Sequence, residues 1–248
     1  MSKQTAKILR LRAPFERKYS IIMRKALRDS LGNLLSTIDK DTTRDEIDLK
    51  VKEKPMQDAY IRLYADVGTF FAEYEAARWK RSHNILIQKT EWKDIWYEQL
   101  KAYAINRAGR RITGVTEYTR KLIWQELTKI KEGEGVSLTA TNIQKAMSTK
   151  MKQVERWRAI RIAQTEIVTA QNQGSFVAAN STGLPMQKEW SAAGANVRET
   201  HQMTNGQIKD IKEPFIVGGV WPAETPGDPN LPPEEVINCK CMVFYDPV

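Results

Sequence analysis

The amino-acid sequence predicts an α+β protein in which a mainly helical, elongated N-terminal region precedes a small α+β C-terminal domain. Proline is absent between Pro55 and Pro185, whereas eight of the ten prolines lie from Pro185 onward. Because an interior proline removes a helix hydrogen bond and clashes with the preceding turn, the proline-free stretch is expected to be helical. Short apolar segments separated by glycine and proline follow it, as is typical of strands and turns. We therefore expect a helical region over 1–157 and a compact domain over 158–248.

The first helix is predicted by a stripe of apolar residues at helical spacing, namely Ile8, Leu11, Phe15, Tyr19, Ile22 and Ala26. Pro14 suits the first position of a helix, so we expect the helix to start near it and to end at Leu31. Gly32 can then adopt the left-handed conformation that terminates a helix. The polar segment 36–54 is expected to be a connector.

The same apolar spacing predicts three more helices, over about 56–80, 92–103 and 115–130. A short helix is expected next over 137–151, opened by Ser137 or Thr139. The longest helical pattern follows over 154–182. Gly183 suits the left-handed position after this helix, and the proline two residues later prevents its continuation.

The C-terminal part contains three segments with strand and turn signals, namely "MQKEWSA", "QIKDIKEPFIV" and "EVINCKCMVFY". Between the second and third lies "WPAETPGDPNLPPEE", with five prolines in fifteen residues. Because proline restricts the backbone and cannot donate a hydrogen bond, we expect an ordered surface loop there.

Positive charge is concentrated in an N-terminal arm of nine Lys and Arg residues, opposed only by Glu16. The arm residues are Lys3, Lys7, Arg10, Arg12, Arg17, Lys18, Arg24, Lys25 and Arg28. From Gly183 onward, nine acidic residues exceed five basic ones. An arm of this density suits a phosphate backbone, an acidic lipid surface or an acidic protein partner. A solvated helix face without a partner is the alternative.

The composition, with 41% apolar residues, allows a real core without a metal ion or disulfides. No apolar run approaches the roughly 20 residues of a membrane span, and the N-terminal segment lacks the apolar stretch of a signal peptide. We therefore expect no membrane partner and maturation in the cytoplasm. The only two cysteines, Cys239 and Cys241, are expected to stay thiols there.

Five segments, in order, resemble the phage Mu F-like head-morphogenesis family. They are "RAIRIAQTEIVTAQNQG" (158–174), "KEW" (188–190), "RETHQMTNGQ" (198–207), "PF" (214–215) and "PGDPNLPPEEVINCKC" (226–241). Each segment alone is weak, but the set in this order and spacing is specific, and it covers roughly the last 90 residues.

The resemblance implies a minor head (capsid) protein of a tailed bacteriophage, carried inside the head near the portal vertex. It implies a role in head morphogenesis and in genome packaging and ejection. The implied partners are the portal protein, the major capsid or scaffold protein, and non-specific double-stranded DNA. The implied location is the virion, after assembly in the host cytoplasm.

The family's motif positions fall on Arg158, Thr165, Glu166, Asn172, Gly174, Arg198, His201, Asn238, Cys239 and Cys241. The sequence departs from the family pattern at three places. Gln164 stands where the family often has arginine, Ala195-Asn196 stands where an acidic residue is common, and Lys240 replaces arginine. These changes alter charges of the motif and leave its small and apolar positions intact.

The two cysteines could serve three purposes. If 236–245 is a strand, its period of two places Cys239 and Cys241 on one face. Two thiolates could then bind zinc with His201 as third ligand, but a fourth ligand is missing and the spacing is shorter than usual. A regulatory disulfide is the second option. We expect the third, two small buried thiols packed against the long helix, and hence no metal and no cofactor.

The alternative function is a hydrolase or metal-binding enzyme centred on His201, Cys239 and Cys241, because a Cys–His pair can act as nucleophile and base. We expect instead that His201 and Arg198 hydrogen-bond to loop carbonyls or to Glu166. Glu166 lies on an otherwise apolar helix face and needs a partner if buried, for which Arg198 is the candidate. The sequence has no phosphate-binding glycine loop, so we expect no enzyme.

The arm leaves two functions open. It either neutralises DNA phosphates without reading sequence, or docks on an acidic portal or scaffold surface. In both cases residues 1–28 are expected to be removable without unfolding the rest.

Overall fold

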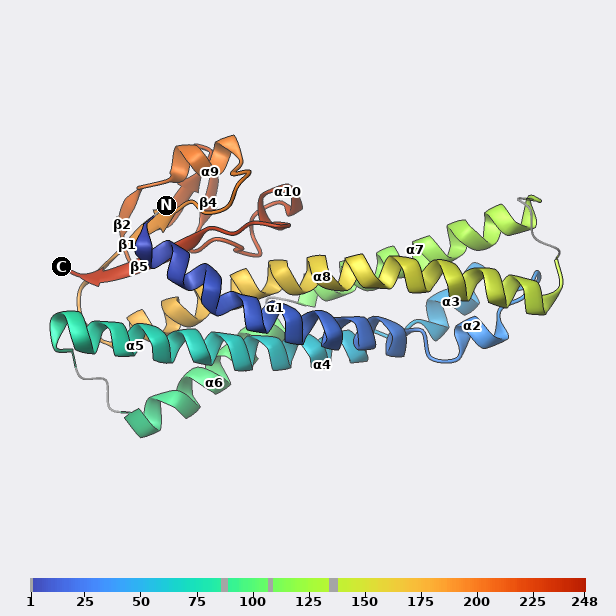
Figure 1. The fold of residues 1–248 in the computed structure, drawn as a ribbon, viewed down its shortest axis with the longest axis horizontal. Helices are drawn as coiled ribbons and strands as arrows, with labels where there is room; N and C mark the ends of the chain where they lie inside the picture. The colour runs from blue at the N-terminus through green and yellow to red at the C-terminus, as the bar shows by residue number, and fades with distance from the viewer. Residues whose placement is uncertain (1, 86–88, 107–108, 134–137) are drawn as a thin grey trace.

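The computed structural model describes residues 2–85, 89–106, 109–133 and 138–248. It confirms the α+β class: long helices lie side by side along one axis, and a small unit of strands and short helices sits at one end (Figure 1). Both chain termini lie at that end (Figure 1). Among the described helices, none is both long and apolar enough to cross a membrane.

Helix α1 (Lys3–Ser30) begins eleven residues before Pro14, so the expected start at Pro14 is wrong. The hydroxyl of Ser2 caps the helix by accepting the N–H of Thr5 at 3.0 Å. Pro14 costs the helix one hydrogen bond, which the buried apolar stripe on either side of it offsets. The expected end is confirmed, because Gly32 has a left-handed φ of 51°.

The expected connector contains two short helices, α2 (Leu34–Thr37) and α3 (Arg44–Lys50). Helix α3 starts with a reciprocal cap, in which Glu46 N–H donates to the Thr43 hydroxyl at 3.3 Å and Thr43 N–H donates to the Glu46 carboxylate at 3.1 Å. Ile47 anchors this helix in the core. The connector is therefore folded, contrary to the expectation.

The helix expected over 56–80 is a continuous helical segment made of α4 (Lys54–Leu63), a π-helical turn, η1 (Tyr64–Gly68), and α5 (Thr69–His83). The two helices expected next are confirmed as α6 (Lys89–Asn106) and α7 (Gly109–Lys131).

Helix α8 (Ala140–Ser181) is the central element, and α1, α5 and η1 pack on it (Figure 1). Thr139 caps its start, as expected, and Gly183 has a φ of 66° after its end. The expected break between 151 and 154 is absent, because apolar residues continue at helical spacing from Met151 to Val154 without a glycine or proline. The division at 157/158, which falls inside α8, stays a prediction.

The main sheet has β1 (Met186–Ser191) at its centre, antiparallel to β2 (Ile208–Asp210) and to β5 (Met242–Pro247). A second antiparallel pair joins β3 (Phe215–Val217) to β4 (Trp221–Ala223). Short helices α9 (Glu199–Thr204) and α10 (Pro233–Val236) complete this unit.

The strand expected over 236–245 begins only at Met242. Helix α10 and a left-handed Asn238 (φ 60°) turn the chain just before it, so Cys239 and Cys241 lie in a bent segment.

Candidate functional site

The motif residues of α8 join this helix to the C-terminal segment. The side-chain amide of Asn172 donates to the carbonyls of Cys241 at 3.1 Å and Pro226 at 3.3 Å, and its oxygen accepts Val243 N–H at 3.0 Å. Two turns earlier on the same helix, the Thr165 hydroxyl accepts the N–H of Asn238 at 3.1 Å. These side chains satisfy backbone groups that no strand partner reaches, and therefore fix where β5 begins.

Gly174 lies where α8 meets the π-helical turn. A Cβ atom on Gly174 would lie 2.1 Å from the carbonyl oxygen of Gly68, and one on Gly68 would lie 2.7 Å from a methyl carbon of Leu100. Only glycine allows the two backbones to approach this closely.

Glu166 is buried and pairs with Arg111, not with Arg198 as the sequence suggested. One Glu166 oxygen accepts the Tyr64 hydroxyl at 2.6 Å and Arg111 Nη1 at 3.2 Å. Arg111 also donates to the carbonyl of Gly227 in the proline-rich loop, so the pair ties α7, α8 and the loop together. Arg111 carried no sequence signal, because it lies 55 residues from Glu166 among other arginines of the same stretch.

The two motif arginines also bind within the chain. Arg198 donates to the carbonyl of Ile237, as expected for a loop contact. Arg158 donates to the Thr119 hydroxyl at 3.0 Å and to the Val115 carbonyl at 3.1 Å, which joins α8 to α7. Desolvation by burial lowers the pKa of Arg158 from its ordinary value.

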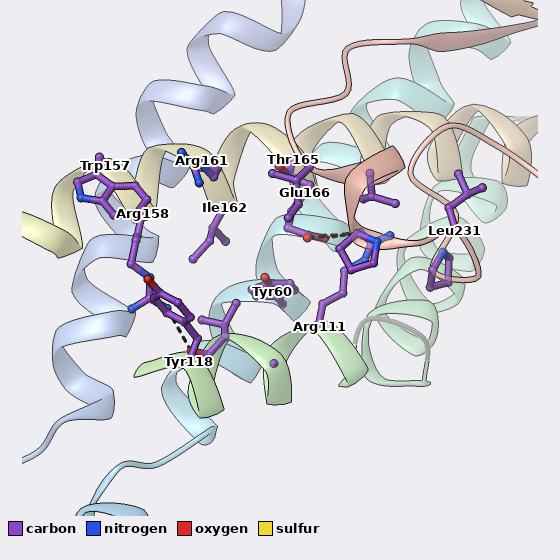
Figure 2. A pocket seen from close by; sticks show the side chains of 16 residues that line it. Tyr60, Arg111, Tyr118, Trp157, Arg158, Arg161, Ile162, Thr165, Glu166 and Leu231 are labelled. Atoms are coloured by element: carbon purple, nitrogen blue, oxygen red, sulfur yellow. Dashed lines mark hydrogen bonds and ion pairs between the residues drawn. The ribbon is translucent and has the colours of Figure 1, made fainter. Parts of the chain in front are cut away.

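A cavity of about 590 Å³ lies between α7, α8 and the proline-rich loop (Figure 2). Its wall is largely apolar and aromatic, with Tyr60, Ile162 and Leu231 on it and the Glu166–Arg111 pair at one side (Figure 2). That carboxylate and guanidinium are engaged with each other, so the cavity offers mainly apolar surface, with Arg161 as a further cation on its wall.

Three side chains that the sequence placed in a candidate site do meet in the structure. His201 Nδ1 lies 3.3 Å from the sulfur of Cys241 and 3.5 Å from that of Cys239, and all three residues are buried. Among the described residues, this is the one group of His, Cys, Asp or Glu whose ligand atoms could hold a metal ion.

Both cysteines are free. The hydrogen bond from the Cys239 thiol lowers the pKa of Cys241, and burial opposes this effect. The same hydrogen bond, together with burial, raises the pKa of Cys239 well above its ordinary value. Cys239, the nucleophile of the hydrolase hypothesis, is buried, and its raised pKa favours the thiol over the nucleophilic thiolate, which disfavours that hypothesis.

Arg12 departs from its expected role as a surface contact. It is 1% exposed and donates to the carbonyl of Lys240 at 2.8 Å and to that of Cys241 at 3.3 Å. It also bonds to the side chain of Gln171. Desolvation by burial lowers its pKa to about 10. Arg12 thus positions the cysteine segment against α1 and α8, and is unavailable to DNA.

The remaining arm cations divide into two sets. Lys18, Lys25 and Arg28 pair with carboxylates at 2.8, 2.5 and 3.5 Å, and Lys7 lies over the Tyr74 ring at 5.1 Å. Within the described part of the chain, no carboxylate lies within 4.0 Å of the second set, which comprises Lys3, Arg10, Arg17 and Arg24.

Helix α1 is not a detachable arm. Its residues Ile8, Tyr19, Met23 and Leu27 belong to the same buried cluster as Ala163 of α8. Removing 1–28 would expose this core, so the packing contradicts the expectation that the rest stays folded.

The family model described as Phage Mu protein F like protein matches residues 121–244, which is half of the chain. The match includes every motif residue from Arg158 to Cys241. Neither the search of curated proteins nor that of solved structures gives a match. This chain belongs to the phage Mu F-like family, which places it among the structural head-morphogenesis proteins of bacteriophage virions.

Proposed function

We propose that the protein is a minor head component at the portal vertex, and that α1 contacts packaged double-stranded DNA without reading its sequence. Family membership supports a role in the phage head. The location at the portal vertex is a more specific proposal than the family alone supports. The DNA contact is carried by one observation, the row of unpaired cations on α1.

This row, which we call the basic stripe, comprises Lys3, Arg10, Arg17 and Arg24. Seven residues separate each from the next, and seven residues are nearly two helical turns, so the four side chains follow one face of α1. The first three are exposed and Arg24 is partly buried. Adjacent members are about 10.5 Å apart along the axis at the usual helical rise, which is wide enough for each to contact a separate phosphate.

Replacing three stripe residues with glutamine, K3Q/R10Q/R17Q, is expected to weaken binding to a random-sequence duplex. Each lost phosphate contact lowers the slope of log affinity against log salt by about 0.9, so the slope should fall by about 2.7. Mobility shift or fluorescence anisotropy at several salt concentrations measures this slope.

The matched control is K18Q/K25Q/R28Q, which removes the same charge from α1 at residues already paired with carboxylates. Its slope should change far less. Equal slopes for the two triple variants would show a net-charge effect and would refute the stripe as the contact surface.

Absence of any shift of random DNA at physiological salt would rule out DNA contact by the isolated protein and favour the second function, an adaptor docked on an acidic portal or scaffold surface. The portal location is tested separately, by the position of the protein in a cryo-EM map of the assembled head. Density away from the portal vertex would contradict it.

A further inference from the structure

The cluster of His201, Cys239 and Cys241 is held together by elements far apart in the chain. His201 lies on α9, whereas the cysteines lie between α10 and β5. Their exposed fractions are 1%, 3% and 2%, so all three side chains are withdrawn from bulk water. Buried thiols and imidazoles usually pack against apolar groups, but here the three polar atoms point at one another within 4.8 Å.

The nitrogen-to-sulfur separations are close to those of ligands around one zinc ion. With a Zn–S bond of about 2.3 Å and a Zn–N bond of about 2.1 Å, tetrahedral angles place the nitrogen and sulfur about 3.6 Å apart. The observed distances from His201 Nδ1 to the two sulfurs are 3.3 and 3.5 Å. The ion would therefore require shifts of only a few tenths of an ångström in these distances.

The groups behind the ligands also suit a metal site. Nε2 of His201 lies 3.0 Å from the carboxylate of Glu235, which Thr200 holds through a hydrogen bond of 2.8 Å. A carboxylate at Nε2 favours a proton on that nitrogen, which leaves the Nδ1 lone pair for a metal. The N–H of Cys241 donates to the sulfur of Cys239 at 3.4 Å, an interaction that stabilises a thiolate.

Arg12 supplies fixed positive charge next to the cysteines. Its guanidinium binds the carbonyls of Lys240 and Cys241, so it restrains the backbone that carries both sulfurs. Desolvated thiolates need compensating charge, which a divalent ion together with Arg12 would provide.

The three side chains border a cavity. The three side chains line a space of about 330 Å³ together with Gly194, Asn196 and other residues of the loop before α9. No fourth His, Cys, Asp or Glu joins the group among the residues that the structure describes. Three protein ligands with water in the fourth position is a known zinc arrangement.

We propose that His201, Cys239 and Cys241 bind one zinc ion, with Glu235 orienting the histidine and water from the adjacent cavity at the fourth position. This departs from the expectation, drawn from the short spacing and the missing fourth ligand, that the cysteines only fill space. The ion would cross-link α9 to the segment before β5, and so fix the segment that Asn172 and Arg12 also hold.

The test uses the full chain, stripped with a chelator and titrated with Zn²⁺ or Co²⁺. We expect about one metal ion per chain by mass spectrometry, and for cobalt a thiolate-to-metal charge-transfer absorption in the near ultraviolet. Titration of the thiols should find two reactive groups without metal and protection of both when zinc is bound.

Three variants and one control locate the site. C239S and C241S should each abolish the cobalt charge-transfer spectrum of the tetrahedral site, and E235Q, which keeps all three ligands, should weaken metal affinity about 10- to 100-fold. The control is H83N, because His83 is the only other histidine and is exposed. It should bind metal as the unaltered chain does.

Metal binding and cobalt absorption of the unaltered chain test the proposal even if a serine variant fails to fold. Substoichiometric zinc without the cobalt absorption would overturn the proposal, whether the thiols are found free or joined as a disulfide. Charge-transfer absorption that persists in folded C239S and C241S, or an unchanged affinity in E235Q, would overturn the assignment of these residues.

Discussion

Gly174→Ala is expected to lower the free energy of unfolding by about 3 kcal/mol or more, because the new methyl group meets backbone and not a flexible side chain. Its Cβ would lie 2.1 Å from the carbonyl oxygen of Gly68 and 2.8 Å from its Cα. Relief requires α8 to move away from the π-helical turn. For a chain of this length we expect a fall in Tm of about 6–12 °C.

The matched control is Gly114→Ala, also in the interior of a helix, where no atom lies within 4 Å of the added Cβ. Alanine is the better helix former, so this variant should gain about 0.5–1 kcal/mol. If thermal and denaturant unfolding show that Gly174→Ala lowers the free energy of unfolding while Gly114→Ala raises it, the close approach at Gly174 is established. A loss at Gly174 no larger than about 0.5 kcal/mol would contradict the contact.

The long amphipathic helices were predictable because apolar spacing depends on local sequence. The π-helical turn was not, since it places Gly68 against Gly174 from a distant part of the chain. Two errors, in contrast, had local causes. Pro14 favours a helix start at that position although the apolar stripe extends before it to Ile8, and the polar composition around the Thr43–Glu46 cap is typical of a connector.

The sequence identified most residues of the candidate site but not which of them interact with each other. The motif identified Glu166, whereas its partner Arg111 could not be chosen from sequence among several arginines. Arg12 could have been assigned correctly, because it falls four residues after Ile8 and three before Phe15, on the apolar stripe itself. A buried cation requires hydrogen-bond acceptors, and the carbonyls of Lys240 and Cys241 provide them for Arg12.

Arg111→Met is expected to cost about 3–5 kcal/mol, because it leaves the Glu166 carboxylate buried without its cation. The Glu166 side chain is 4% exposed, and the Tyr64 hydroxyl would be its remaining donor among the described residues. The matched control is Arg161→Met at the same cavity, where the arginine is exposed and stacks on Trp157 at 4.9 Å. Loss of this stacking should cost about 1 kcal/mol or less. Denaturant unfolding measures both.

A double-mutant cycle separates the charge pair from packing. Glu166→Gln keeps the size of the side chain and removes its charge, so it should cost less than Arg111→Met. In the double variant the neutral amide no longer requires a cation, and the total loss should fall short of the sum by at least about 1 kcal/mol. Additive losses would show that Arg111 acts only through Gly227 and its packing against α8. In that case the pair would not be what holds the proline-rich loop to α7 and α8.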